Sequence, residues 1–179
     1  MVSDRVETWP MTTPEVLPGA EPMSHEGTTD VGVLVLHGFT GNPSSMRGVA
    51  EAMAAVGHHV EMPRLPGHGT TIDDMLDTGW ADWTAEVAAA HARLAGRVDT
   101  VVVIGLSMGG SLTLWSGLTL PGVVGLVCVN PVTMAQPAEV IEMITEMVAD
   151  GTEIAPAIGG DIADPDAVEI AYDGVPLRA

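Results

Sequence analysis

VVVIGLSMGG, residues 101–110, is the stretch that decides the fold of this chain. Its β-branched start predicts a buried strand, and the small residues that follow predict a sharp turn into a helix. The pattern G-x-S-x-G at such a turn is typical of a nucleophile elbow, where the serine has a strained backbone and an exposed hydroxyl. A plain turn with a capping serine is the alternative interpretation. Because the strand comes before the pattern and small residues come after it, we predict that Ser107 is a nucleophile.

A second strand-to-loop transition lies upstream, in VLVLHGFTGNP at residues 33–43. A serine that attacks a carbonyl needs backbone N–H groups to stabilise the oxyanion, and loss of one donor typically costs about 2.7–4 kcal/mol. One donor is expected from Met108, the residue after the nucleophile, and the other from Phe39 in this early loop. The same loop also predicts a helix start, with Asn42 as N-cap and Pro43 at the first helical position.

Alternating strand and helix signals predict an α/β fold with a mostly parallel sheet flanked by helices. With 179 residues the chain suits one domain with a substantial core. The predicted elements, in chain order, are strand 31–36, helix 43–56, strand 58–62, a long loop at 63–79, helix 80–95, strand 100–104, a helix after Ser107 to about 118, strand 123–129 and helix 138–149.

Two of the predicted helices carry an apolar face at helical spacing. The face of the first helix consists of Met46, Val49, Met53 and Val56, and that of the second consists of Trp83, Val87, Ala90 and Leu94. Both faces are expected to pack against the sheet. Residues 1–29 are expected to be loosely ordered or to form an edge strand that leads into the core.

Three motifs follow one another in the chain: HGFTG at 37–41, RLPGHG at 64–69 and GLSMGG at 105–110. Together they resemble the carboxylesterase and monoacylglycerol lipase branch of the α/β-hydrolase superfamily, which is also described as serine aminopeptidase-like. The resemblance covers about residues 30–135, and it implies the α/β-hydrolase fold for this chain.

The resemblance also divides the chain into three parts. It implies a lead-in at 1–29, the N-terminal part of the hydrolase core at 30–132, and a truncated cap-like segment at 133–179. The predicted helix at 138–149 is broadly apolar and rich in methionine, a flexible side chain that suits acyl chains. Packing of these methionines on the core is an equally good explanation.

The histidines of this chain all precede the predicted nucleophile; they are His25, His37, His58, His59, His68 and His91. In the superfamily that the motifs resemble, the acid and then the histidine follow the serine along the chain. We therefore expect the acid and the base beyond Ala179, with the last core strands absent. A serine without its base is a weak nucleophile, so the 179-residue chain is expected to be nearly inactive alone. The aspartates after Ser107 are interpreted as solvated loop residues or helix caps; they are Asp150, Asp161, Asp164, Asp166 and Asp173.

The chain is strongly acidic, with a formal charge of −18 and six Lys+Arg residues, all arginine. This balance argues against nucleic acid or an anionic membrane as a partner. The single cysteine, Cys128, is expected to be a small core residue, and the absence of a possible disulfide suits a reducing cytoplasm. Neither a signal-peptide pattern nor an apolar run of about 20 residues is present, so no membrane insertion is expected.

The resemblance implies a serine hydrolase that cleaves carboxylic esters, either short- or medium-chain acyl esters or monoacylglycerol. Ser107 would attack the ester carbonyl, the amides of Phe39 and Met108 would hold the oxyanion, and water would release the acyl-enzyme. No cofactor and no metal are implied. Two alternatives remain: an amidase or aminopeptidase, which shares this machinery, and a non-catalytic binding module with the same fold.

Overall fold

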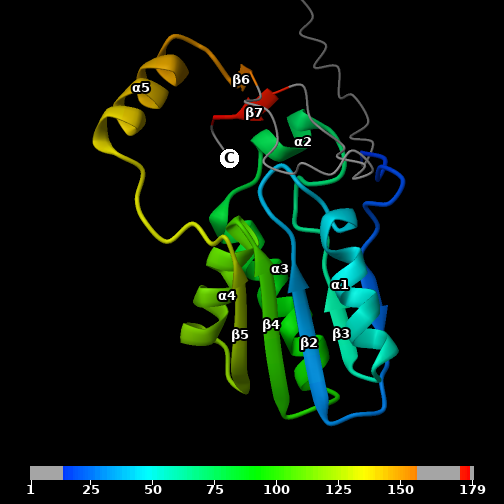
Figure 1. Cartoon of the computed structure of the whole chain (residues 1–179). Coiled ribbons are helices and arrows are strands. Elements are labelled where there is room, and N and C mark those ends of the chain that lie inside the picture. The colour runs from blue at the N-terminus through cyan, green and yellow to red at the C-terminus, as the bar shows by residue number, and fades with distance from the viewer. Residues whose placement is uncertain (1–13, 157–173, 178–179) are drawn as a thin grey trace, which may run out of the picture.

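A five-stranded sheet forms the centre of the molecule in the computed structural model, which describes residues 14–156 and 174–177 (Figure 1). The strand order is β1-β3-β2-β4-β5, with β1 antiparallel to β3 and the other pairs parallel. The predicted α/β fold with a mostly parallel sheet is confirmed. The strands are β1 (Met23–His25), β2 (Val31–Leu36), β3 (His59–Met62), β4 (Thr100–Leu106) and β5 (Val123–Val129).

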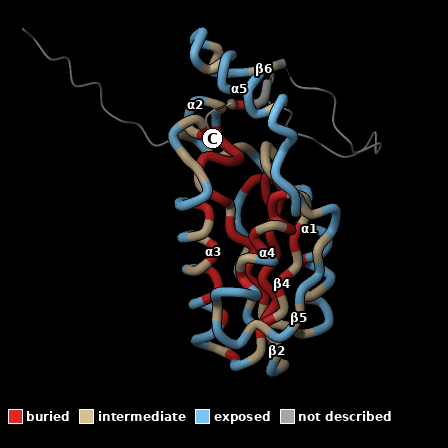
Figure 2. The backbone as a smooth tube through the Cα atoms, turned by 90° about the vertical axis from the view of Figure 1, so that its left-hand side faces the viewer, coloured by how far each residue is buried: buried red, intermediate tan, exposed pale blue. Residues whose placement is uncertain are grey.

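Helices flank this sheet on both faces. The helices are α1 (Ser44–Ala55), α2 (Ile72–Leu76), α3 (Trp80–Ala95), α4 (Met108–Thr119) and α5 (Ala138–Ala149). Two further short strands, β6 (Ile154–Pro156) and β7 (Gly174–Pro176), pair antiparallel with each other. Helices α3 and α4 pack on one face, and α1 packs on the other. Side chains alternate along β2, so that Leu34 and Leu36 face α3 and α4 while Val33 and Val35 face α1. Figure 2 shows that the buried residues are concentrated along the strands and on the inner side of α3.

The apolar faces of the two long helices turn out differently. In α3 all four predicted residues are buried, which confirms the prediction. In α1 only Met46 of the predicted face is buried; Met53 is half-buried, and Val49 and Val56 are exposed. The prediction for α1 was wrong in part because Val56 lies beyond the last helical residue, as its C-cap. Ala50 fills the buried position beside Met46 instead.

Two short elements were not predicted with residue bounds: strand β1 and helix α2. Strand β1 lies at the edge of the sheet, which agrees with the edge-strand alternative for the lead-in, whereas residues 1–13 lie outside the described part. Helix α2 falls inside the predicted loop at 63–79. Its N-cap is Thr71, whose hydroxyl accepts a hydrogen bond from the backbone N–H of Asp74 at 3.3 Å. Five residues are too few to show a helical period in the sequence.

Strand β5 carries Cys128, which was expected to be a core residue, and that prediction was wrong. Val124 is 68% exposed, and Val127 and Val129 are each nearly half exposed. The reason is topological: within residues 14–156 and 174–177, β5 pairs only with β4 and forms an edge of the sheet. Cys128 accordingly is half-buried rather than a core residue.

The cap-like segment lies beyond the carboxyl end of β5. Figure 1 shows α5 projecting from the core on an extended connection, with β6 and β7 near α2 at that end of the sheet. No residue of α5 is buried in the described structure. Residues 157–173 and 178–179 of this segment lie outside the described part. Among the residues that are described, no helix is both long and apolar enough to cross a bilayer.

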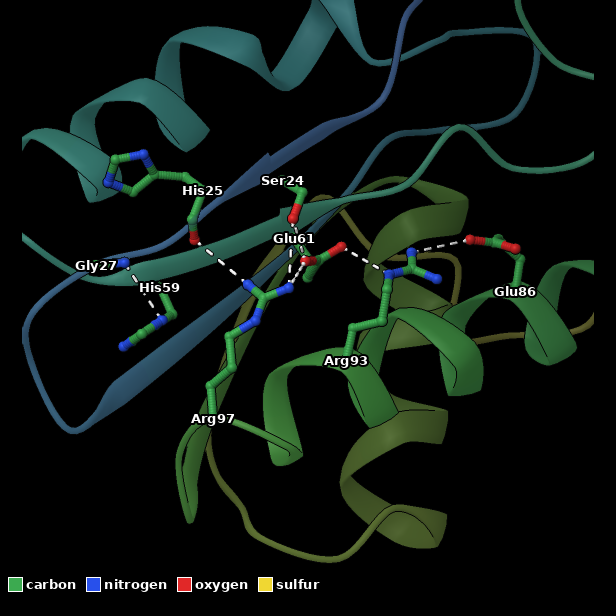
Figure 3. A network of polar contacts seen from close by, with 8 residues as sticks. All are labelled: Ser24, His25, Gly27, His59, Glu61, Glu86, Arg93 and Arg97. Atoms are coloured by element: carbon green, nitrogen blue, oxygen red, sulfur yellow. Dashed lines mark hydrogen bonds and ion pairs between the residues drawn. The ribbon is translucent and has the colours of Figure 1, made fainter.

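A buried carboxylate, Glu61 on β3, ties the sheet edge to α3 (Figure 3). Its Oε1 accepts hydrogen bonds from Arg97 at 2.6 Å and from the Ser24 hydroxyl at 2.5 Å, and its Oε2 accepts one from Arg93 at 2.8 Å. Burial alone would raise the pKa of Glu61, but the hydrogen bonds from Ser24, Arg93 and Arg97 outweigh it and hold this pKa below its ordinary value. The network joins strands β1 and β3 to the C-terminal end of α3.

Candidate active site

Ser107 is the one residue between the end of β4 and the start of α4. Its backbone has φ 53° and ψ −117°, a conformation that residues other than glycine rarely adopt. The N–H of Ser107 donates to the carbonyl of Val129 on β5 at 2.9 Å, and its carbonyl accepts from the N–H of Gly110 at 2.8 Å. The strained turn predicted from the sequence is therefore present at this serine.

The glycines on either side of Ser107 are required by close backbone contacts. A Cβ on Gly105 would lie 2.1 Å from the carbonyl oxygen of Gly109, inside any permitted contact distance. A Cβ on Gly109 would lie 2.4 Å from the carbonyl oxygen of Leu36, at the end of β2. The turn can therefore close between strand and helix only where these two side chains are missing.

The loop after β2, residues 37–41, lies directly against this turn. Strands β2 and β4 are parallel neighbours with Leu36 opposite Gly105, so both chains leave the sheet at the same edge. A Cβ on Gly38 would lie 3.3 Å from the Cβ of Ser107. The structure thus brings the predicted residues Phe39, Ser107 and Met108 to one edge of the sheet.

Two backbone amides at this edge have no acceptor in the described part of the chain. Within the described residues, neither the N–H of Phe39 nor that of Met108 donates a hydrogen bond to a protein group. Met108 is the first residue of α4, where helix N–H groups lack intrahelical partners and carry partial positive charge. Such free donors beside a serine hydroxyl can bind a negatively charged oxygen.

Aromatic rings pack against the loop at 37–41 through the side chain of Phe39. The ring of Phe39 lies 6.0 Å from that of His68 and 5.8 Å from that of Trp83, measured between ring centroids. The carbonyl of Pro66 accepts hydrogen bonds from Nδ1 of His68 at 2.9 Å and from Nε1 of Trp83 at 3.1 Å. These contacts hold the turn at 64–69 against the loop that carries Phe39.

His37 connects the same two segments. Its Nδ1 lies 2.9 Å from the carbonyl oxygen of Gly38, and its Nε2 accepts from the N–H of Leu65 at 3.1 Å. The ring is fully buried, and burial, helped by the nearby His68, lowers the pKa of His37 to about 3. Burial also lowers the pKa of His68. Both rings are therefore neutral near pH 7.

None of the six histidines, all of which lie within the described residues, hydrogen-bonds the hydroxyl of Ser107. His58 contacts Thr29, and His59 accepts from the N–H of Gly27, both at the amino end of β3 and away from the serine. His91 is buried on α3. Of the aspartates that follow the serine, Asp150 is the C-cap of α5; the other four, Asp161, Asp164, Asp166 and Asp173, lie outside the described part of the chain.

Metal-binding side chains do not gather in the described residues: no group of three or more His, Cys, Asp or Glu side chains lies close enough to hold an ion. The arrangement at the sheet edge offers a strained serine and free backbone donors instead. Sequence reasoning missed the bridging role of the His37 ring and of the Pro66 carbonyl. The Pro-Gly-His-Gly motif was the available signal, but it indicates only a tight turn and not the partner of that turn.

A family model described as the alpha/beta hydrolase family matches residues 33–176, which include the strained serine and the loop after β2. The chain belongs to the alpha/beta hydrolase family. The predicted resemblance is confirmed, and the sheet order and the flanking helices are those of this hydrolase fold.

This alpha/beta hydrolase is 43% identical over 167 residues to a thermostable monoacylglycerol lipase of a Bacillus species, covering 92% of this chain and 64% of the lipase. It is 32% identical over 102 residues to a carboxylesterase of Bacillus subtilis, covering 56% of this chain and 41% of the esterase. A solved structure from work on LipS and LipT, two metagenome-derived lipolytic enzymes, has a TM-score of 0.83 and 40% identity, over 92% of this chain and 66% of that one. The chain thus spans less than two thirds of the length of each of these proteins.

Proposed function

We propose that the protein is a serine hydrolase of carboxylic esters in which Ser107 is the nucleophile. The observation that carries the proposal is the strained Ser107 packed against Gly38, with the amides of Phe39 and Met108, which donate to none of the described residues, beside it. Relatives named as monoacylglycerol lipase and carboxylesterase support an ester as the substrate. Short- or medium-chain acyl esters and monoacylglycerol are the proposed substrates.

In the proposed reaction the hydroxyl oxygen of Ser107 attacks the ester carbonyl carbon, and a general base takes the hydroxyl proton. The carbonyl oxygen becomes an oxyanion that accepts hydrogen bonds from the N–H groups of Phe39 and Met108. The alkoxy group leaves with a proton from the same base, which gives an acyl-serine. A water molecule, deprotonated by that base, then attacks the acyl carbon and releases the carboxylic acid and the free serine.

The general base and its acid are proposed to come from the part of the hydrolase fold that this chain does not span. The support is that none of the six histidines hydrogen-bonds the Ser107 hydroxyl in the described structure, and that the matched lipase is longer than the matched region. The 179-residue chain alone is accordingly proposed to be nearly inactive and prone to associate through the exposed apolar side chains of β5.

The cap-like segment at 133–179 is proposed to cover the acyl chain of the substrate. Its support is α5, whose apolar side chains are all at least partly exposed and include Ile141 and Met143. A cytoplasmic location is also proposed, supported by the single cysteine of the chain, which excludes an internal disulfide.

The test uses full-length protein expressed from its complete reading frame. Hydrolysis of a series of p-nitrophenyl esters and of a monoacylglycerol should be readily measured, and Ser107→Ala should abolish it. A fluorophosphonate probe should label the wild type and leave Ser107→Ala unlabelled. Ser111→Ala is the matched control, because the Ser111 hydroxyl is occupied by a hydrogen bond to the Val132 carbonyl at 2.7 Å; it should retain activity and labelling.

Three results contradict the proposal. Hydrolysis that survives Ser107→Ala places the nucleophile elsewhere. Faster turnover of aminoacyl anilides than of any ester would mean that the protein hydrolyses amide bonds, as in the aminopeptidase alternative. Folded wild type that neither hydrolyses any substrate nor reacts with the probe points to a binding module.

A further inference from the structure

We propose that His37 is a positioning residue for the oxyanion-binding amide of Phe39, acting through the carbonyl group of Gly38. The inference rests on the proposed ester hydrolysis, because it gives a task in that reaction to a second residue of the same site. In the sequence analysis His37 is only one of the histidines that precede the predicted nucleophile.

The hydrogen bonds of His37 fix a single tautomer of its ring. The backbone N–H of Leu65 can only donate, and it points at Nε2 from 3.1 Å. Nε2 is therefore unprotonated, and in the neutral ring the proton lies on Nδ1. Nδ1 donates in turn to the carbonyl oxygen of Gly38, which is 2.9 Å away and can only accept. The buried ring has two partners and no freedom to exchange them.

The carbonyl oxygen of Gly38 is held by a second donor, the N–H of Gly41, at 3.2 Å. This carbonyl and the N–H of Phe39 belong to the same peptide group, and in a trans peptide the two bonds point to opposite sides. With the oxygen held on the side of the imidazole, the Phe39 N–H is turned to the other side, where none of the described residues accepts a hydrogen bond from it. The peptide cannot rotate without losing both hydrogen bonds to its oxygen.

The fixed peptide lies beside the nucleophile. A Cβ on Gly38 would be 3.3 Å from the Cβ of Ser107 and 3.3 Å from the carbonyl oxygen of Leu106. The imidazole thus links the turn at 64–69, through Leu65, to the peptide that follows Gly38, the residue packed against the serine. An oxyanion donor whose direction is set before the reaction needs no reorganisation when the charge develops.

Two substitutions separate the two hydrogen bonds of this ring. In His37→Asn the side-chain NH₂ can take the place of Nδ1 and donate to the Gly38 carbonyl, while the bond from Leu65 is lost. In His37→Gln the longer side chain can place its carbonyl oxygen near Nε2 and accept from Leu65, while the donor to Gly38 is lost. Both variants remove the same buried ring.

The expected result is a difference in kcat between these variants. Loss of one oxyanion donor typically reduces kcat by about 10²–10³. A donor that remains but is free to rotate should reduce kcat by a smaller factor. We expect His37→Gln to lower kcat by about 10–100-fold with KM nearly unchanged, and His37→Asn to retain most of the wild-type kcat. The affinity for a boronic acid, which forms a tetrahedral adduct with the serine, should fall in parallel with kcat.

The matched control is His91→Gln, which removes another buried imidazole at a distance from the loop. Its kcat should equal that of the wild type once the folded fraction is matched by circular dichroism. Equal kcat for the Asn and Gln variants of His37, or a loss that appears only in KM, overturns the proposal in favour of a purely structural role. A wild type without Ser107-dependent hydrolysis is a separate result, which rejects the proposed function itself.

A measurement on the wild type tests the proposal if the variants do not fold. Nitrogen-15 NMR of the His37 ring distinguishes a protonated Nδ1 from a protonated Nε2. We expect the Nδ1-protonated neutral tautomer throughout pH 5–8. A ring protonated on Nε2 cannot donate to the Gly38 carbonyl, and this result overturns the assignment.

Discussion

Gly38 lies so close to Ser107 that a Cβ on the glycine would be 3.3 Å from the Cβ of the serine. This contact joins two segments that are about 70 residues apart in the sequence. Because β2 and β4 are adjacent and parallel, the loops that follow them meet at one edge of the sheet. The contact sets the distance between the proposed nucleophile and the proposed oxyanion donors.

Gly38→Ala should therefore reduce ester hydrolysis more than it reduces stability. The new methyl group would press on the Leu106 carbonyl oxygen at 3.3 Å, and a displacement of about 1 Å at such a site can cost about 10²-fold in rate. Gly48→Ala is the control, because a Cβ there meets nothing within 4 Å on the exposed side of α1. Steady-state kinetics on both variants checks the prediction, and an unaltered kcat in Gly38→Ala contradicts it.

Gly48→Ala itself should stabilise the protein. A glycine in the interior of a helix costs about 0.5–1 kcal/mol relative to alanine, and the added methyl group has open space. We expect the free energy of unfolding in urea to rise by about this amount, with an unchanged slope of unfolding free energy on denaturant concentration. A lower midpoint would mean that α1 is not helical at this position.

The backbone conformation of Ser107 predicts an unusual order of stabilities. A non-glycine residue at φ 53° and ψ −117° costs about 1–3 kcal/mol, which glycine avoids. Ser107→Gly should thus be more stable than Ser107→Ala by about 1 kcal/mol, after allowance for the larger entropy of glycine in the unfolded chain. Urea unfolding of the two inactive variants compares them directly, and the reverse order would show that the turn is relaxed in solution.

Glu61→Gln should destabilise the fold by about 1–3 kcal/mol, because the carboxylate is buried and two arginines depend on it. The loss should be smaller than for a fully buried pair, since Arg93 is 44% and Arg97 22% exposed and both can be hydrated. Glu86→Gln removes a partly exposed partner of Arg93 and should change stability by less than about 1 kcal/mol. Similar thermal midpoints for the two variants would argue against the network.

Stability should fall as the pH is lowered through the range of His37. Its pKa is about 3 in the folded protein and 6.5 ordinarily, so between these values the unfolded chain binds a proton that the folded chain does not. Stability therefore rises with pH across this window and is lost as pH falls below about 6.5, by up to about 1.4 kcal/mol per pH unit for one proton. His37→Asn lacks this titration and should show a shallower slope in urea unfolding at pH 4–7. An equal slope would assign the acid sensitivity to other groups, of which His68 is the first to examine.

Local patterns predicted the elbow and α3 correctly, because both are determined within a few residues. The pair Gly105 and Gly109 encodes the close turn, and the spacing of Trp83 and Val87 encodes a helix face. The partial exposure of Cys128 on β5 escaped prediction, because burial of a residue in a strand depends on the neighbours that cover it, and the residues of the strand do not identify those neighbours. The hydrogen bond from Leu65 to His37 crosses 28 residues, and no sequence pattern records that distance.

Two of the five residues of the elbow, Gly105 and Gly109, are required because they have no Cβ atom. At Gly105 and Gly109 any side chain would overlap a backbone carbonyl, whereas the hydroxyl of Ser107 takes no part in closing the turn within the described structure. The backbone of the turn and the reacting group therefore depend on different residues: another small nucleophile could replace the serine with the backbone unchanged, but a single methyl group on either glycine could not be accommodated. At this turn the reacting group can be changed by substitution at one residue, whereas the two glycine positions must stay without side chains.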